Sequence, residues 1–459
     1  MIQNPSVFKK KWFPFSLVFF ISFLLYLADL PDNYSRSLQR HNHRRLISTQ
    51  DAFPSTFIPY TLLKQGTFSL EGARTAFELT QDRIKIPFYV SVVDGKYYSK
   101  YPVFMGLIST PIYTLPIVLN KVPNITSYDN VLKIFVLGRI SAAFYSSLSV
   151  ALFYLILTKL REFYKKEKHE EVWIILFTVF YAFGTTTYSI SSRALWQHTG
   201  AQFLISIIIL FILNGLSNTK YIKWVGLFTG LAVLCRPTTV ILAAVLTIYV
   251  FLYYRKEFLK FLVLATPAAV FLFSYNHIVF GGILREGYQS VGDTKFTGNI
   301  LDGIVGLLFT PTHGVLFISP PLLLSIHSII KTIRLKRVTP GNSVDNFNIL
   351  KRFLTVILLL HMVVVSLWWC WWGLDSFGYR MLTEYIPIIG LFSYETFRSL
   401  GKWFKYIILL LIIFSIYTNL NSVVSFISRC ETFHFWSFEC ISPQKDTLML
   451  IQSIFVRRE

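Results

Sequence analysis

Long apolar runs separated by short polar segments form the main pattern along the chain. Runs of about 18 apolar residues match the length of a helix that crosses a bilayer. The pattern predicts an all-α, polytopic membrane protein with about 11 transmembrane helices. The expected spans are residues 12–28, 134–158, 172–190, 199–215, 224–236, 238–253, 261–279, 315–330, 353–371, 382–397 and 406–427.

Clusters of Lys and Arg predict the orientation of these spans, because short basic loops stay on the cytoplasmic side. Such clusters lie at residues 9–11, 159–168, 219–223, 254–260, 331–337 and 398–405. With all of them cytoplasmic, the spans after residue 158 come in pairs. The pair 224–236 and 238–253 is interrupted by "CRPTT". The C-terminus is then expected outside.

The apolar run 101–119 does not fit this count. If it crossed the membrane, the lysines at 9–11 would lie outside. The run contains three prolines, so we expect an interfacial or re-entrant helix within a large outer loop, 30–133. The basic stretch 36–45 would then be outside, which long loops tolerate better than short ones.

A single membrane-embedded domain, residues 1–459, accounts for the whole pattern. It contains the first span at 12–28, the outer loop 30–133, further spans in 134–427 and an extracytoplasmic tail, 428–459. No small-residue cleavage site follows the first span, so we expect it to be retained.

Composition agrees with a membrane location. Hydrophobic residues make up 53% of the chain, while the net charge is +20. Such an excess suits basic loops and contacts with lipid phosphates, and a nucleic-acid partner is not expected because the basic residues lie in short loops. Of four cysteines, Cys430 and Cys440 could form a disulfide or remain free thiols.

Asp51 is the first candidate for chemistry, since acidic residues are scarce in the outer segments. It precedes the apolar stretch "AFPSTFIPYTLL". It could cap the helix that begins there. It could also be a carboxylate at the membrane boundary, where low dielectric raises its basicity towards a hydroxyl proton.

Other candidates lie in the outer loop and at the outer ends of the predicted spans. Lys100 could bind a lipid-linked phosphate or extend to the headgroups, and Arg236 at the helix break is costly unless paired or hydrated. The aromatic segment 368–372 could be an interfacial belt or a sugar-stacking wall with a phosphate-binding arginine. The remaining polar or aromatic candidates are Arg193, Gln197, His198, His313, Trp372, Asp375 and Arg380.

The order of these motifs resembles the GT-C superfamily of integral-membrane glycosyltransferases. The chain is similar in layout to bacterial relatives of protein O-mannosyltransferases and lipid A aminoarabinose transferases. The matching motifs are the outer-loop Asp51, "KYP" at 100–102, "RPT" at 236–238 and "WWGLDSFGYR" at 371–380.

This resemblance implies transfer of a sugar from a polyprenyl-phosphate carrier to a lipid, glycan or protein acceptor, usually with inversion. Asp51 matches the acidic residue that acts as base or positions the acceptor. Lys100 and Tyr101 match the element whose lysine meets the donor phosphate, with Tyr101 in place of a proline. Arg236 and Arg380 are expected to assist on that phosphate. Gln50 and Ala52 flank Asp51, so no acidic pair supports a divalent metal there.

The expected location is a bacterial inner membrane, with the active site facing the extracytoplasmic side. A transporter or flippase of lipid-linked sugars is the alternative function. It predicts charges within the spans and two matched halves, and neither pattern is clear in the sequence. A non-catalytic scaffold, in which Asp51 only caps a helix, is a further alternative.

Overall fold

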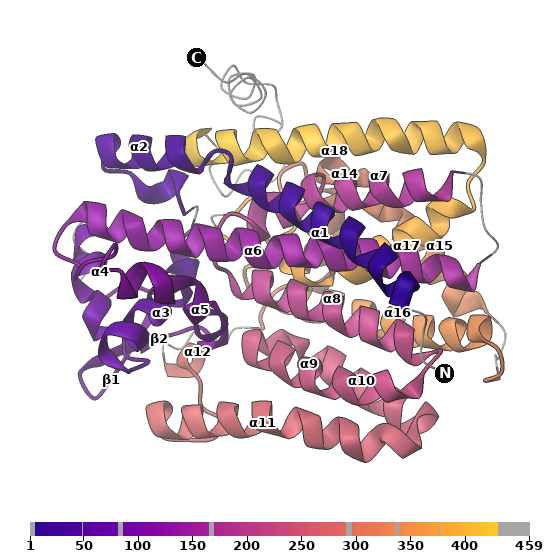
Figure 1. Ribbon diagram of the computed structural model, residues 1–459, viewed down its shortest axis with the longest axis horizontal. Helices are drawn as coiled ribbons and strands as arrows, with labels where there is room; N and C mark the ends of the chain where they lie inside the picture. Colours follow the sequence, from indigo (N-terminus) through magenta and orange to yellow (C-terminus); the bar gives the residue numbers. More distant parts are fainter. Residues whose placement is uncertain are drawn as a thin grey trace.

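The computed structural model describes residues 5–47, 49–80, 86–164, 169–290, 296–335, 339–374 and 376–429. Helices make up most of these residues, and one two-stranded hairpin is the only sheet among them. The long helices lie side by side in a bundle, with α18 at one edge and α11 at the other (Figure 1). The predicted all-α class is therefore confirmed.

A helix occupies each of the eleven predicted spans. In the described part of the chain, six helical segments are long and apolar enough to cross a membrane: Phe13–Arg40, Tyr128–Phe163, Gln197–Gly215, Arg255–Phe280, Ser343–Leu367 and Lys402–Val423. The corresponding helices are α1 (Pro5–Leu27) with α2 (Leu30–Arg40), α6 (Tyr128–Leu160), α8 (Gln197–Gly215), α11 (Arg255–Phe280), α16 (Ser343–Leu367) and α18 (Lys402–Arg429).

The remaining predicted spans contain shorter helices. They are α7 (Glu170–Phe183), α9 (Ile222–Cys235), α10 (Val240–Tyr253), α15 (Leu324–Arg334) and α17 (Ile386–Arg398). The predicted span 315–330 is broken into α14 (Val315–Ile318), a 3₁₀ turn (Pro320–Leu323) and α15. Two consecutive prolines explain the break, since proline lacks the N–H that a helix interior needs.

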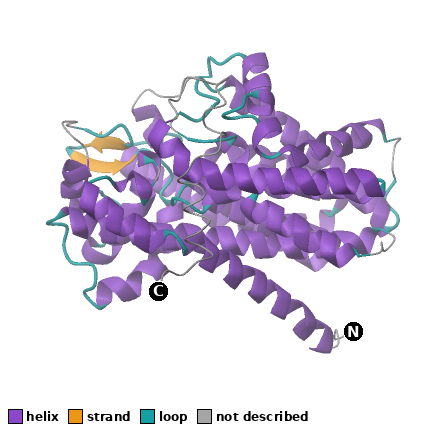
Figure 2. Cartoon of the chain, turned by 90° about the horizontal axis from the view of Figure 1, so that it is seen from above, coloured by secondary structure: helices purple, strands orange, loops and turns teal. Residues whose placement is uncertain are grey.

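The predicted outer loop forms a compact group of short elements at one end of the bundle (Figures 1 and 2). It contains α3 (Phe53–Gln65), α4 (Arg74–Thr80), β1 (Val90–Val93), β2 (Lys96–Ser99) and α5 (Phe104–Val118). The strands pair antiparallel around Asp94 and Gly95, both at positive φ, as a two-residue hairpin turn requires. Helix α5 matches the predicted helix within 101–119.

Helices α3 and α5 pack closely, and a glycine makes this possible. A Cβ added at Gly106 of α5 would lie 2.8 Å from Cβ of Ile58 in α3. Non-bonded carbon atoms do not approach so closely, so only glycine fits at this position. This contact fixes α3 against the segment that contains Lys100 and Tyr101.

Two glycines bring α9 and α11 together in the same way. A Cβ at Gly226 would lie 2.1 Å from the carbonyl oxygen of Phe261, and one at Gly230 would lie 2.9 Å from Cβ of Ala268. Small residues four positions apart allow this approach in membrane helices. Helix α9 ends at Cys235 and α10 begins at Val240, which confirms the predicted break.

A buried ion cluster joins the end of the first helix to α6 and to the turn before α8. Asp29 accepts a hydrogen bond from Nη2 of Arg139 at 3.1 Å and one from Nη2 of Arg193. Nη2 of Arg139 also donates to the carbonyl oxygen of Tyr26 at 3.2 Å. One carboxylate thus offsets much of the cost of burying two guanidinium groups.

Candidate active site

A cavity of about 220 Å³ lies where the outer-loop elements meet the ends of the bundle helices. Its polar wall combines segments that are far apart in the sequence: Asp51, Lys100, Gln197, His198, Arg236, Thr238, Glu286 and Arg380. Aromatic rings form much of the remaining wall: Phe88, Tyr101, Trp196, Tyr288, Phe296, Trp368 and Trp369. A concave, largely apolar site with a few convergent polar groups is typical of ligand binding.

Asp51 lies in a 3₁₀ turn, Gln50–Ala52, immediately before α3. Its Oδ1 accepts a hydrogen bond from the phenol of Tyr101 at 2.7 Å, and its Oδ2 accepts one from Nη1 of Arg380 at 3.0 Å. The N-cap residue of α3 is Ala52. The helix-cap interpretation of Asp51 is therefore wrong, and its carboxylate instead joins the outer loop to the late turn at Arg380.

Polar neighbours surround that carboxylate more closely than the sequence suggested. We expected an apolar setting that raises its basicity, but both oxygens have hydrogen-bond donors. The Asp51 side chain keeps 18% of its surface exposed, so it remains accessible from the cavity. Both the burial of Tyr101 and the nearby Asp51 raise the pKa of the Tyr101 phenol, which therefore stays protonated and donates.

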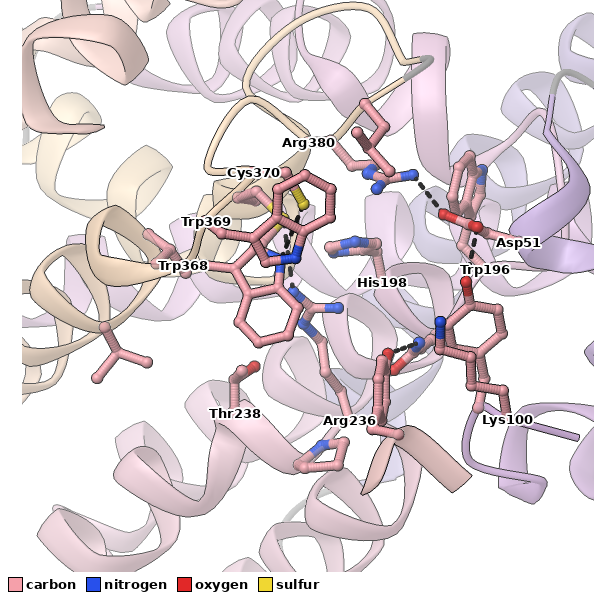
Figure 3. A pocket seen from close by; sticks show the side chains of 18 of the residues that line it. Asp51, Lys100, Trp196, His198, Arg236, Thr238, Trp368, Trp369, Cys370 and Arg380 are labelled. Atoms are coloured by element: carbon pink, nitrogen blue, oxygen red, sulfur yellow. Dashed lines mark hydrogen bonds and ion pairs between the residues drawn. The ribbon is translucent and has the colours of Figure 1, made fainter. Parts of the chain in front are cut away.

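Arg380 begins the 3₁₀ segment Arg380–Tyr385. Its guanidinium carbon lies 4.6 Å from the centre of the Trp196 ring, close enough for a cation–π interaction. Its Nε is buried and has no hydrogen-bond partner among the residues that the structure describes. The indole and Asp51 together hold this guanidinium in the cavity wall (Figure 3).

Arg236 follows α9 directly and lies beside a buried acid, Glu384. Its Nε donates to Oε1 of Glu384 at 2.5 Å, while His198 Nδ1 lies 2.7 Å from Oε2 of the same carboxylate. The Glu384 side chain is 0% exposed. Glu384 is not among the predicted site residues, although an acid at the start of an apolar segment is a signal of function.

Lys100 lies at the end of β2, where its N–H donates to the carbonyl oxygen of Tyr89 at 3.1 Å. Its Nζ is 5.9 Å from the ring centres of both Tyr101 and Tyr288. The Tyr288 phenol accepts a hydrogen bond from Nε2 of Gln197 at 2.9 Å. The hairpin and α8 therefore meet at this side of the cavity.

Glu286 lines the cavity wall and, like Glu384, is not among the predicted site residues. It lies in the polar segment after α11, a region in which no motif was recognised. Burial raises the pKa of its carboxyl group, which favours the neutral form.

Three predicted site residues do not line this cavity. Arg193 belongs to the Asp29 ion cluster, and its guanidinium lies 5.6 Å from the Tyr188 ring centre. Trp372 packs edge-to-face against Trp371, with ring centres 5.6 Å apart. Trp368 and Trp369, from the same aromatic segment, form the wall instead.

His313 is the third predicted site residue that does not line the cavity. Its Nε2 lies 3.1 Å from the carbonyl oxygen of Ser376, and its Nδ1 lies 2.8 Å from the Thr312 hydroxyl. It thus joins the loop before α14 to the loop before Arg380.

Some predictions fall outside what the structure describes. Asp375, Cys430 and Cys440 lie outside the described residues. Within the described ranges, no group of three or more His, Cys, Asp or Glu side chains could hold a metal ion.

Comparisons with known proteins return one structural neighbour. No protein-family model matches the chain, and no curated protein matches it in sequence. The fold is similar to the crystal structure of ArnT from Cupriavidus metallidurans bound to undecaprenyl phosphate, with 13% sequence identity and a TM-score of 0.49. The match covers 92% of this chain and 66% of the ArnT chain.

Proposed function

We propose that this multi-pass membrane protein is a glycosyltransferase. It moves a sugar from a polyprenyl-phosphate carrier to an acceptor at the extracytoplasmic face of a bacterial inner membrane. The observation that supports this proposal most strongly is that one cavity brings together Asp51, Lys100, Arg236 and Arg380 from four distant segments. A carboxylate beside three cations suits proton transfer from a hydroxyl next to a phosphate leaving group.

The three cations would bind and stabilise the phosphate. When the bond between the anomeric carbon and the phosphate oxygen breaks, negative charge grows on that oxygen. Guanidinium groups form paired hydrogen bonds to phosphate, and Lys100, whose Nζ lies 5.9 Å from the Tyr101 ring centre, contributes a compact charge. Fixed donors of this kind stabilise developing charge most strongly in a cavity shielded from water.

Asp51 would position the acceptor hydroxyl and take its proton as the new glycosidic bond forms. Direct displacement by that hydroxyl inverts the anomeric centre. Retention needs a second carboxylate as nucleophile about 5 Å from the first. Glu286 is the other carboxyl among the described residues of the cavity wall, and burial raises its pKa, which disfavours the ionised form that a nucleophile needs.

The aromatic wall suits the sugar and its lipid carrier. Trp368 and Trp369 lie across the cavity from Asp51, with His198 between them (Figure 3). Flat indole faces stack on the apolar faces of sugar rings. Val364 and Val365 extend this wall along α16 with apolar side chains suited to a prenyl chain.

The deciding experiment compares Asp51→Asn with Tyr101→Phe. Tyr101→Phe removes the hydrogen bond to Asp51 and keeps the carboxylate. Asp51→Asn keeps an oxygen that can accept from the Tyr101 phenol but removes the proton acceptor. We expect Asp51→Asn to lower sugar transfer by about 10²–10⁴-fold, the usual contribution of a general base. Tyr101→Phe should cost no more than about tenfold, as expected for one hydrogen bond.

The measurement is release of free polyprenyl phosphate from a glycosylated donor in proteoliposomes. Near-wild-type release by well-expressed Asp51→Asn protein would contradict the assignment of the base. A transporter would move the donor without cleaving it, so a purified protein that releases no polyprenyl phosphate would refute the transferase proposal. Mass spectrometry of surface glycans with and without the protein would identify the sugar and the acceptor.

A further inference from the structure

We propose that Glu384 is a positioning residue, which fixes the tautomer of His198 and the orientation of Arg236 at the cavity. This inference rests on the proposed function and assigns a role to a residue below the site. In this role His198 presents Nε2 to the cavity as a hydrogen-bond acceptor for a substrate hydroxyl. Arg236 presents its two terminal nitrogens to the donor phosphate.

The burial of Glu384 makes its hydrogen bonds strongly directional. Its side chain is 0% exposed, and each carboxylate oxygen has a close basic partner. Oε1 accepts from Nε of Arg236 at 2.5 Å, and Oε2 lies 2.7 Å from Nδ1 of His198. His361 lies behind, with its Nε2 3.8 Å from Oε1. A buried carboxylate with this many partners has one well-defined orientation.

The proton on His198 follows from the chemistry of its partner. An ionised carboxylate only accepts hydrogen bonds, so Nδ1 must carry the proton that joins it to Glu384. In the neutral ring, Nε2 then has a free lone pair. Because the His198 side chain lines the cavity, this nitrogen is the one available to a bound molecule. The same carboxylate–imidazole arrangement orients the histidine in hydrolytic triads.

Contacts at Nε and Nη2 orient the guanidinium group of Arg236. Glu384 binds Nε, and the sulfur of Met381 lies 4.0 Å from Nη2, which is a weak contact. Since Arg236 lines the cavity and its Nε already binds Glu384, we assign the two terminal nitrogens to the ligand. A planar fork held by a carboxylate on one side suits a phosphate on the other.

The chemistry of the predicted ligand follows from these two groups together. A hydroxyl donor and a phosphate must lie side by side, because His198 and Arg236 share one carboxylate. A sugar phosphate has both groups within a single molecule. The geometry therefore points to a hydroxyl on the transferred sugar as the partner of His198 Nε2.

The test substitutes Glu384→Gln, which keeps the size and removes the charge. The glutamine oxygen can still accept from Arg236, but its amide then donates to Nδ1 of His198. The proton on the imidazole is thereby forced to Nε2, and the nitrogen facing the cavity becomes a donor. We expect a fall in kcat of about tenfold or more, as for one lost charge-assisted hydrogen bond. The KM for the donor should rise because Arg236 is held less firmly.

Glu395→Gln is the matched control. Glu395 is also an ion-paired glutamate, with only 9% of its side chain exposed. Nζ of Lys351 and the Ser328 hydroxyl each lie 2.6 Å from its carboxylate, but it does not line the cavity. A structural role common to buried ion pairs would affect both variants alike. A positioning role predicts that folded Glu395→Gln protein keeps wild-type kcat and KM.

The decisive readout is nitrogen NMR of protein labelled at histidine, with the His198 signals assigned from a His198→Asn variant. We expect Nδ1–H at His198 in the wild type and in Glu395→Gln, and Nε2–H in Glu384→Gln. An Nε2–H wild-type ring would overturn the inference even if no Glu384 variant folds. An unchanged tautomer in Glu384→Gln would also overturn it. If undecaprenyl phosphate fails to bind the wild type, the proposed function fails, while the tautomer still decides the role of Glu384.

Discussion

Replacing Gly226 with alanine should displace Arg236, although the two residues are far apart along α9. Gly226 faces the backbone of α11, and an added Cβ would lie 2.1 Å from the carbonyl oxygen of Phe261. Ordinary contact between such atoms needs about 3.4 Å, so the two helices must separate by roughly 1 Å. Relief by side-chain rotation is not available, because the opposing atom belongs to the backbone.

The size of the effect follows from the geometry of α9. At 1.5 Å per residue, Arg236 lies about 15 Å along the helix from Gly226, and a helix transmits displacement over that distance with little loss. A misplacement of about 1 Å at a catalytic group can cost about 10²-fold in rate. Overpacking of this kind also costs about 1–3 kcal/mol of stability. We therefore expect sugar transfer to fall by about 10- to 100-fold in protein that still folds.

Gly401→Ala is the control, since an added Cβ there meets no atom within 4 Å. The assay compares donor cleavage and thermal midpoints of the two variants with wild type, at equal amounts of folded protein. The Gly401 variant should match wild type in both. If Gly226→Ala also matches wild type, then α9 does not position Arg236 and the reasoning from helix packing is wrong.

Two further substitutions test other parts of the fold. Burial lowers the pKa of His313 from 6.5 to about 4, so between these values the unfolded chain binds a proton that the folded chain does not. The free energy of unfolding should fall by up to about 3 kcal/mol as the pH drops through this window. The measurement is thermal unfolding from pH 7 to 4, with the exposed His327→Gln as the control. The melting temperature of His313→Gln should depend less on pH than that of the control. Asp29→Asn should cost about 3–5 kcal/mol, because Arg139 and Arg193 lose their shared carboxylate. A melting temperature like that of wild type would contradict this second expectation.

The helical layout was predictable because membrane spans are marked by length and composition. Each predicted span contains helix, and the interruption between α9 and α10 lies at the expected "CRPTT". The exact extents were not predictable in the same way. The predicted span 315–330 ignores Pro320 and Pro321, which end one helical turn and start another.

The site was only partly predictable, because sequence shows unusual residues but not their partners. Asp51 and Lys100 were identifiable as charged residues of the outer loop, and Arg236 and Arg380 as charged residues beside predicted spans. The cavity unites all four. Arg193 has the same local signature, yet its partner is Asp29 in the ion cluster.

Glu384 is the opposite case, a residue at the site that was not predicted. It lies within the predicted span 382–397, where an acid is an unusual residue, but its role appears only when Arg236 and His198 lie on either side of it. The order of the helices in space, which the sequence does not specify, determines such pairings.

The charges around the cavity support the proposed chemistry as a whole. Lys100, Arg236 and Arg380 contribute three positive charges, while Asp51 and Glu384 contribute two negative charges. The count covers the groups assigned to the proposed reaction; Glu286, whose carboxyl pKa is raised by burial, is not one of them. The resulting excess of one positive charge matches the single negative charge of a sugar phosphodiester.

The net charge of these cavity groups also matches the charge of the phosphate during the proposed reaction. When Asp51 takes the proton of the acceptor hydroxyl, the excess around the cavity rises to two positive charges. The leaving phosphate monoester then carries between one and two negative charges. Proton transfer to Asp51 and departure of the phosphate therefore stabilise each other. A neutral residue at position 51 would remove both the proton acceptor and this compensation, so Asp51→Asn should slow bond cleavage more than it weakens donor binding.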